Sequence, residues 1–316
     1  MKLLVLGNSN FFQKKAYDAF NACGFHEFDV ASVSKKRLFL EEKKIGKVFS
    51  DYKKAINESA ASICYITTSN DLHFPLALSA LEKGLHVILD KPATLSLENT
   101  KALIEQAEKK RLGLGEANIF LFHDVFYEIQ RTFEEYKSNP SKIHLSFQFP
   151  IFKEGNFRLN PEMGGGAIFD LAAYAISPGR FFYPKQIYEL NGFQIIKNDL
   201  IYSFNFTSLF QDGSCITGEF GFDYQYRNFI SLTNKEVYLE SNRIFSATKN
   251  LQLEISGQAN GHRISKKINP SCSFQRFLSS FLDSIEKKDF QSSYQNILYD
   301  AEGLDKLKNQ LIKKEI

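Results

Sequence analysis

The stretch Ile63–Pro92, ICYITTSNDLHFPLALSALEKGLHVILDKP, determines the fold class. An apolar run over 63–67 is followed by a helix-like segment over about 72–83, which stops at Gly84, and then by a second apolar run over 86–89. Glycine directly after a helical pattern is a common helix stop. Two strand-length apolar runs joined by a helix predict a right-handed βαβ unit with parallel strands.

The same alternation continues on both sides of this unit. Strands are expected at 3–6, 28–33 and 112–117, and helices are expected at 11–22 and from 96 onward. Strands and helices in strict alternation form a parallel sheet with helices on both faces. The first 118 residues are therefore predicted to be a doubly wound Rossmann domain.

The pattern changes after about residue 120. Two helices are expected there at 122–136 and 166–182, and a final helical pair carries Phe274 and Leu304. Strand-like runs rich in Phe, Ile and Tyr are expected at 142–149, 201–210, 214–223, 226–233, 236–241 and 250–256. Their short, hairpin-type separations favour antiparallel pairing. We expect two domains, residues 1–118 and residues 119–316.

Composition excludes several classes of protein. The 316 residues carry 39 basic and 36 acidic side chains, a net charge of +3, which is too balanced for a chain that mainly grips nucleic acid or an anionic membrane. The four cysteines form no CxxC pair, so a thiolate zinc site is not expected and no metal is assigned. The N-terminus does not read as a signal peptide and no run is long enough to span a membrane. These features favour a cytoplasmic protein.

The sequence GNSNFF at Gly7–Phe12 stands where a dinucleotide-binding loop belongs, between the first strand and the first helix. The usual fingerprint has glycines at its first, third and sixth positions, and only the first is present here. Ser9 is small enough to admit a phosphate, whereas Phe12 is bulky, so the alternative is an ordinary tight turn. As a cofactor loop, the segment assigns contacts to Gly7, Ser9, Asn10, Phe11 and Phe12.

The end of the second strand bears on the choice of cofactor. Sites that prefer NAD place a carboxylate there for the ribose 2′-hydroxyl, but this chain has SVSKKR over 32–37. Hydroxyl groups and cations suit a 2′-phosphate, so NADP(H) is favoured and NAD(H) stays possible. The alternative is a solvated basic loop. The candidate contacts are Ser32, Ser34, Lys35 and Arg37.

Two further motifs follow the next strands. Ligands of doubly wound sheets bind at the carboxyl ends of the strands. Thr68, Ser69, Asn70 and His73 follow the third strand and are candidates for lining the cofactor ribose, although His73 could instead make a structural hydrogen bond at a helix start. Asp90 and Lys91 follow the fourth strand, with Lys91 fixed by the rigid backbone of Pro92. This lysine can bind a substrate oxygen or move a proton, unless it is simply an exposed lysine.

A glycine-rich segment precedes the helix expected at 166–182. Residues 164–166 are all glycine, which permits a close backbone approach, and Asp170 and Tyr174 follow. Residues four apart on a helix share a face. A carboxylate and a phenol projecting together from an apolar helix are hard to explain by packing, so we expect a functional role.

In this order and spacing, the motifs resemble those of the glucose-fructose oxidoreductase / inositol dehydrogenase (Gfo/Idh/MocA) family. Residues 68–73 match its Thr-Pro-Asn-x-x-His motif, with Ser69 in place of proline. Residues 90–92 match its Glu-Lys-Pro motif, with Asp90 in place of glutamate. Residues 162–174 match its second signature, with Tyr174 where many members have histidine.

The resemblance implies a Rossmann domain followed by an α/β domain with a large open, mainly antiparallel sheet, which commonly forms a dimer or tetramer interface. It also implies hydride transfer between NAD(P) and a sugar-type carbon. Lys91 would contact the reacting oxygen and the nicotinamide ribose, Tyr174 would give or take the proton, and Asp170 would hold the substrate or orient the pair. Arg158 resembles a substrate-contacting position of the nucleotide-sugar members.

Three functions remain open from the sequence. The first is an NADP(H)-dependent oxidoreductase that acts on a sugar, free or nucleotide-linked. The second is a non-catalytic dinucleotide-binding regulator or scaffold of the same fold, which the altered Gly7–Phe12 loop favours. The third is an oxidoreductase of small aromatic diols. Retention of both Lys91 and Tyr174 argues for the enzyme, because a sensor has no chemical need for them.

Overall fold

The computed structural model describes residues 1–33 and 45–316, which form two compact units. Unit 1 contains Met1–Asn118 and Phe274–Ala301, and unit 2 contains Ile119–Ser273 and Glu302–Ile316. The packing therefore assigns 274–301 to the first unit. The domain boundary after residue 118 stays a prediction.

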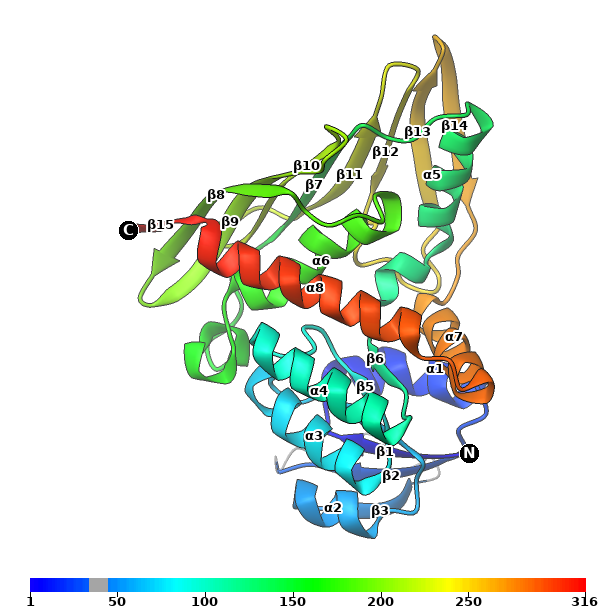
Figure 1. Ribbon diagram of the computed structural model, residues 1–316, viewed down its shortest axis with the longest axis vertical. Coiled ribbons are helices and arrows are strands. Elements are labelled where there is room, and N and C mark those ends of the chain that lie inside the picture. Colours follow the sequence, from blue (N-terminus) through cyan, green and yellow to red (C-terminus); the bar gives the residue numbers. More distant parts are fainter. Residues whose placement is uncertain (34–44) are drawn as a thin grey trace. The chain divides into compact units, whose positions relative to one another are not determined.

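Unit 1 is built on a six-stranded parallel sheet with the order β3-β2-β1-β4-β5-β6 (Figure 1). This is the Rossmann strand order, and the direction of winding reverses between β1 and β4. The strands are β1 (Lys2–Leu6), β2 (Glu27–Ala31), β3 (Ile45–Phe49), β4 (Ile63–Ile66), β5 (His86–Leu89) and β6 (Leu114–Glu116).

The helices of unit 1 begin and end where local chemistry dictates. Ser96 Oγ accepts the Asn99 N–H at the start of α4, and Gly84, with φ of +94°, ends α3. A π-helical turn at Phe12–Ala16 leads into α1, where the sequence predicted one continuous helix. The helices are α1 (Tyr17–Ala22), α2 (Tyr52–Glu58), α3 (His73–Lys83), α4 (Leu97–Lys110), α7 (Ser273–Lys287) and the first part of α8 (Gln291–Gln310).

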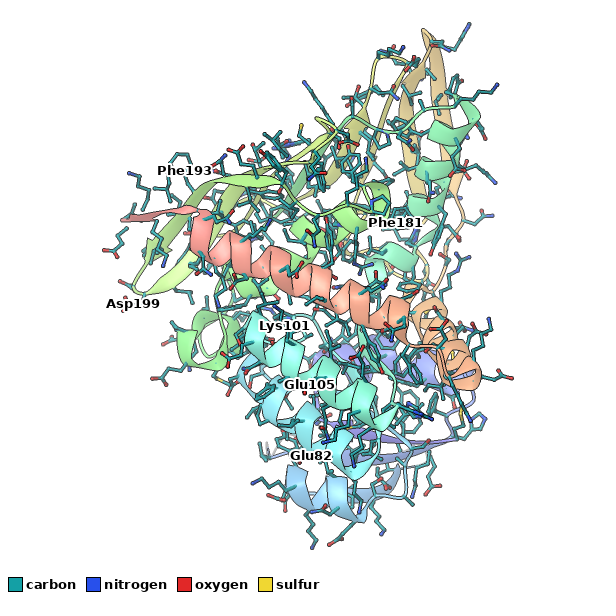
Figure 2. All side chains as sticks on the ribbon, in the orientation of Figure 1. Glu82, Lys101, Glu105, Phe181, Phe193 and Asp199 are labelled. Atoms are coloured by element: carbon teal, nitrogen blue, oxygen red, sulfur yellow. The ribbon has the colours of Figure 1, made fainter. Side chains whose placement is uncertain are left out.

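Helices cover both faces of this sheet. On one face, α3 and α4 lie side by side and bury apolar strand residues such as Leu4 and Val87. Their outer surfaces carry charged side chains, including Glu82, Lys101 and Glu105 (Figure 2). On the other face, α7 packs so closely on β6 that a Cβ at Gly115 would lie 3.0 Å from the Phe281 ring. This packing is why the helix predicted around Phe274 belongs to unit 1.

Unit 2 is built on a nine-stranded sheet with the order β14-β13-β12-β11-β7-β10-β9-β8-β15. Its pairs are antiparallel except β7–β10 and β8–β15. The strands are β7 (Lys142–Phe149), β8 (Glu189–Lys197), β9 (Leu200–Leu209), β10 (Cys215–Phe222), β11 (Arg227–Thr233), β12 (Val237–Asn242), β13 (Leu253–Ala259), β14 (His262–Ile268) and β15 (Ile312–Glu315). The two units confirm the predicted fold class.

One face of the large sheet is covered by helices. The helix α6 (Ala167–Phe182) packs on β7, β9 and β10, and α5 (Asp124–Glu135) packs on β13 (Figure 1). The end of α8 is tied to β8 because Gln194 Nε2 donates to the carbonyl oxygen of Leu307 at 2.6 Å. Alternate residues of the strands face away from these helices, among them Phe193, which is 42% exposed.

The elements predicted from the sequence are present with bounds that differ by no more than three residues. The sequence analysis missed α2 and the strands β3, β8, β14 and β15. In all four strands the sequence pattern typical of a strand is weak. The edge strands β14 and β15 are rich in lysine, β3 is also an edge strand, and β8 contains Gly192. Apolar alternation is the primary signal for a strand, and charged edges dilute it.

The described residues contain neither a membrane-spanning helix nor a metal-binding cluster. Within residues 1–33 and 45–316, no helix is both long and apolar enough to cross a membrane. The same residues contain no cluster of three or more His, Cys, Asp or Glu side chains that could hold a metal. All four cysteines are free thiols.

Candidate active site

Lys91 lies in a loop that is anchored on both sides of it, directly after β5. Before it, Asp90 accepts hydrogen bonds from Tyr65 Oη at 2.5 Å and Thr67 Oγ1 at 2.6 Å. After it, His73 Nδ1 donates to the carbonyl oxygen of Pro92 at 2.8 Å, and the Ala93 N–H donates to Glu116 Oε1 at 2.8 Å. Side chains from α3, β4 and β6, and Thr67 directly after β4, thus fix the backbone that carries Lys91. The Lys91–Pro92 peptide bond is cis.

Burial determines the charge of the groups that hold this loop. Burial lowers the pKa of His73, so the neutral imidazole is favoured, and Nδ1 must carry its hydrogen to bind a carbonyl. Burial raises the pKa of Asp90, an effect opposed by its two hydroxyl donors and by the nearby charges of His73 and Lys91. Burial also raises the pKa of Tyr65 well above its usual range, which keeps its hydroxyl a donor.

The turn after β1 approaches the end of β4 closely. Gly7 has φ of +107°, and a Cβ there would lie 2.6 Å from the carbonyl oxygen of Thr67, so only glycine fits. Ser9 Oγ lies 2.6 Å from Thr67 Oγ1 and accepts the Phe12 N–H at 3.0 Å. Gly7 and Ser9 therefore shape this turn, and the Asn10 side chain is exposed beside it.

Asn8 is a candidate ligand contact that the sequence analysis passed over. Gln13 Nε2 donates to Asn8 Oδ1 at 2.5 Å, which fixes the orientation of the Asn8 amide. In the described part of the chain, its buried Nδ2 has no acceptor. A buried donor without a partner, at the glycine turn of a Rossmann sheet, fits an oxygen-rich group such as a phosphate or a ribose. Its place inside the turn was the available signal.

Two phenylalanines of this segment serve packing. Phe12 is fully buried, with its ring 6.1 Å from Tyr65 and 6.3 Å from Phe28. The Phe12 side chain therefore points into the core, and its assignment as a cofactor contact stays a prediction. The Phe11 ring is half-buried against Phe274, at 5.8 Å.

The residues after β4 divide between surface and core. Thr68 and Ser69 are half-buried, and Thr68 Oγ1 donates to the carbonyl oxygen of Ser69 at 3.2 Å. Asn70 is 6% exposed. His73 is fully buried, its Nδ1 donates to the carbonyl oxygen of Pro92, and its Nε2 has no hydrogen-bond partner in the described part of the chain. The Nδ1 hydrogen bond fits the structural role that the sequence left open, and the assignment of His73 as a cofactor contact stays a prediction.

The basic segment after β2 can be followed only in part. Ser32 is half-buried, and its backbone N–H donates to the carbonyl oxygen of Phe49 at 3.0 Å. Ser34, Lys35 and Arg37 lie outside the described residues.

In unit 2, the glycines before α6 lie against the preceding loop of the same chain. A Cβ at Gly165 would lie within 2.7 Å of the carbonyl oxygens of Phe157, Arg158 and Asn160. The Gly165 and Gly166 N–H groups donate to the Asn160 and Arg158 carbonyls at 2.9 and 2.8 Å. The close approach predicted from the glycines is thus made by the 157–160 loop, which is held against the start of α6.

Arg158 and Asp170 form an ion pair. Arg158 Nε lies 2.9 Å from Asp170 Oδ1, and its guanidinium stacks over the rings of Phe157 and Phe152 at 4.7 and 5.3 Å. The Asp170 side chain is 11% exposed and that of Arg158 is 32% exposed. Arg158 therefore fixes the carboxylate that the sequence analysis assigned to substrate.

Tyr174 lies one helical turn after Asp170 on α6, inside a cage of aromatic rings. The ring centroids of Phe120, Phe147 and Phe245 lie 4.9, 5.0 and 5.3 Å from that of Tyr174. Tyr174 is half-buried. Three rings that pack on one phenol restrict its rotamer, which is what a precisely placed proton donor requires.

Four residues of these arrangements were missed by sequence reasoning: Asn8, Tyr65, Thr67 and Glu116. Thr67 and Glu116 lie at the carboxyl ends of β4 and β6, so their position in a Rossmann sheet was a usable signal. Tyr65 lies within a buried strand, where nothing in the pattern distinguishes it from a core residue.

The structure combines a Rossmann sheet with a large open sheet. Lys91 follows β5 of the first sheet, and Asp170 and Tyr174 lie on α6, which packs on the second. This combination is typical of two-domain proteins that bind a dinucleotide. Residues 1–116 match the model of the oxidoreductase family with an NAD-binding Rossmann fold, Gfo/Idh/MocA. The match covers β1 to β6 and ends with β6.

Two relatives illustrate the similarity in sequence. The chain is 23% identical over 293 residues to D-xylose 1-dehydrogenase (NADP(+)) 2 of Haloferax volcanii, a match that covers 89% of this chain and 88% of that protein. It is 23% identical over 215 residues to dTDP-3,4-didehydro-2,6-dideoxy-α-D-glucose 3-reductase of Saccharopolyspora spinosa, covering 66% of this chain and 64% of the relative.

Among solved structures, the fold is similar to that of a 3-ketoreductase from Actinomadura kijaniata in complex with NADP and TDP-benzene. The TM-score is 0.93 at 20% identity, over 100% of this chain and 99% of the other. An aldose-aldose oxidoreductase from Caulobacter crescentus has a TM-score of 0.87 at 17% identity, over 98% and 97% of the two chains. At these identities, the likeness establishes the fold alone.

Proposed function

We propose that this protein is an NADP(H)-dependent oxidoreductase that transfers hydride between the nicotinamide and a carbonyl or hydroxyl carbon of a sugar, free or nucleotide-linked. The observation that carries the proposal is Lys91, whose loop is anchored on both sides at the carboxyl edge of a Rossmann sheet. The relatives described above are named as sugar dehydrogenases and reductases, and two of those names or titles include NADP.

The residues of unit 1 fit a dinucleotide. Gly7 allows the turn after β1 to pass close to β4, and the Asn8 amide offers a buried donor at that turn. Asn8 would hold a phosphate or ribose oxygen, and Thr68 and Ser69 would line the same edge. When bound, NADP(H) supplies or accepts the hydride. The assignment of Ser34, Lys35 and Arg37 to a 2′-phosphate is part of this proposal and supports NADP(H) over NAD(H).

In the reductive direction, the chain contributes charge and a proton. Lys91 stabilises the negative charge that develops on the carbonyl oxygen, and its anchored loop fixes where the ammonium can reach. Tyr174 gives the proton to that oxygen, and in the oxidative direction it takes the proton back. Asp170 binds a substrate hydroxyl, with Arg158 holding the carboxylate in place.

The first test is a titration of the purified protein with NADPH and, separately, NADH, which follows nicotinamide fluorescence enhancement. Tight binding with NADPH preferred supports the proposal. A preference for NADH retains the oxidoreductase and removes the 2′-phosphate argument. If neither nucleotide binds, the dinucleotide assignment fails, and with it both the enzyme and the regulator.

Turnover is tested by absorbance at 340 nm, with D-xylose and NADP⁺ and with NADPH and a panel of dTDP- and UDP-linked ketosugars. Lys91→Ala is expected to lower turnover at least 100-fold, the usual contribution of a placed acid–base or electrostatic group. Lys101→Ala is the matched control, since Lys101 is exposed on α4 of the same unit. NADPH binding without turnover of any sugar in the panel would favour the dinucleotide-binding regulator.

Two coarser properties complete the proposal. A homodimer or homotetramer through the large sheet is supported by its uncovered face, where Phe193 is 42% exposed beside a shallow groove of about 490 Å³ that His144 and Thr217 also line. Light scattering after size-exclusion chromatography measures the oligomeric state, and a monomer at micromolar concentration would contradict the proposed oligomer.

A cytoplasmic location is supported by the four free thiols.

A further inference from the structure

A directed chain of hydrogen bonds connects the turn after β1 to the loop that carries Lys91. Its members are the Phe12 N–H, Ser9 Oγ, Thr67 Oγ1 and the Asp90 carboxylate, with separations of 3.0, 2.6 and 2.6 Å. Tyr65 Oη occupies the other carboxylate oxygen at 2.5 Å. The chain lies within unit 1 and joins residues of three different segments.

The direction of every hydrogen in the chain follows from the number of donors. An ionised carboxylate only accepts, so Thr67 gives its single hydroxyl hydrogen to Asp90. Thr67 can then only accept from Ser9, and the Ser9 oxygen is left to accept the Phe12 N–H. With Asp90 ionised, no alternative assignment satisfies all four groups, so replacing one hydroxyl leaves its neighbour without a partner.

The chain of hydrogen bonds ends at Asp90, the residue directly before Lys91 in the sequence. The positive charge of Lys91 lowers the pKa of Asp90, as the smallest of several causes that act on this carboxyl group. The other groups facing this carboxylate are the Tyr65 hydroxyl from β4, the Thr67 hydroxyl and the His73 imidazole from α3, and Asp71 in turn faces His73. A hydroxyl that donates to a carboxylate partly neutralises its negative charge. The number of such donors therefore determines how strongly the carboxylate attracts a nearby ammonium group.

We propose that Tyr65 and Thr67 are positioning residues for Lys91, which act on it through the Asp90 carboxylate, and that Ser9 extends this coupling to the turn after β1. The inference relies on the proposed function only for what Lys91 does in the reaction. The coupling itself concerns the amine of Lys91 and can be measured without any cofactor or substrate.

The test is the pH profile of Lys91 acetylation by trace acetic anhydride, with each lysine followed by mass spectrometry and Lys101 as the internal reference. Asp90→Asn removes a negative charge and is expected to lower the midpoint of Lys91 by about one unit. Tyr65→Phe and Thr67→Val each remove a donor, so that more of the carboxylate charge faces the ammonium, and each is expected to raise the midpoint by about half a unit. The Lys91 midpoint is thus expected to move down in Asp90→Asn and up in the other two variants. A general loosening of the structure would not shift the midpoint in opposite directions.

Two matched controls separate coupling from loss of a buried hydroxyl. Tyr294→Phe removes a buried hydroxyl that donates to the Leu112 carbonyl at 2.5 Å in the same unit. Thr100→Val removes a buried hydroxyl 2.8 Å from Thr94 Oγ1. Neither is expected to move the Lys91 midpoint. Thr67→Ser keeps the hydroxyl and should restore the wild-type profile, which also covers the case in which Tyr65→Phe fails to fold.

The proposal is overturned if the Lys91 profile in Thr67→Val coincides with that of the wild type, or if Asp90→Asn leaves it unchanged. NADPH titration then gives the second readout: Thr67→Val should weaken binding severalfold, and Thr67→Ser should not, because the chain reaches Ser9. If the wild-type protein binds no NADPH, the proposed function fails while the acetylation profiles still decide the coupling.

Discussion

Lys91 and Tyr174 are held by different kinds of interaction. In unit 1, hydrogen bonds from Tyr65, Thr67, His73 and Glu116 fix the Lys91 loop, and aromatic rings such as Phe12 fill the core near those groups. In unit 2, aromatic rings contact Tyr174 directly. A loop needs hydrogen bonds because its backbone has no regular partners, whereas a helix already satisfies its backbone and needs only side-chain packing. The following predictions test this contrast.

The largest effect is expected from Phe12→Gly. The substitution empties a fully buried ring site and adds a flexible residue to a helical turn, so the free energy of unfolding should fall by about 5 kcal/mol. Urea denaturation measures it, and Phe11→Gly, which removes a half-buried ring, should cost less than half as much. A loss of under 1 kcal/mol would contradict the core role of Phe12, and tighter binding of NADPH would show that its ring blocks a phosphate site.

Tyr174→Phe should lower turnover about 100-fold or more, which corresponds to about 2.7 kcal/mol in the barrier. The ring and its three aromatic contacts are retained, so the thermal midpoint should not fall. Tyr183→Phe is the control in unit 2, because its buried hydroxyl has no partner in the described part of the chain. Steady-state rates of both variants are compared, and near-normal turnover by Tyr174→Phe would remove this residue from the mechanism.

Gly165→Ala should destabilise the protein by about 2 kcal/mol, because the added methyl group would overlap three carbonyl oxygens within 2.7 Å. Since these oxygens belong to the 157–160 loop, the change should also displace Arg158 from Asp170. Gly155→Ala serves as a comparison: it has open space around it and only the strain of φ at +79°. Thermal unfolding that ranks Gly155→Ala as the more damaging change would contradict the close approach.

The smallest effect is a pH dependence in the Lys91 loop. Burial lowers the pKa of His73 below its unfolded value of about 6.5, so the unfolded chain binds the proton more readily. The stability from neutral His73 is complete above about pH 6.5 and falls as the pH drops below it, by up to about 1 kcal/mol per pH unit. His73→Gln, whose amide can still donate to Pro92, should flatten the thermal midpoint between pH 5.5 and 6.5, and the exposed His262→Gln should not. Equal slopes in both variants would rule out this role.

The candidate site residues could be selected from the sequence because they stand at strand ends and at one helix start, and their roles in catalysis stay predictions. Lys91, Asp170 and Tyr174 all combine a chemically unusual residue with such a position. The partners of these residues could not be predicted in the same way: Tyr65 is separated from Asp90 by 25 positions and looks like any aromatic residue in a buried strand.

Two interpretations changed because a one-dimensional pattern does not give the direction of a side chain. The bulk of Phe12 counted against the phosphate loop only if its ring faced the ligand, but the ring enters the core. Three glycines predicted a close approach without identifying the partner, which is the preceding loop of the same chain.

The packing of α7 on the first sheet has a consequence for synthesis on the ribosome. Phe281 and Phe277 cover Gly115, and Phe274 covers Phe20 and Tyr65, yet these rings are translated more than 150 residues after β6. Until they emerge, the part of the sheet that lies under α7 is uncovered. Nascent chains of this protein therefore pass through a long stage in which chaperones that bind exposed aromatic surface have a target.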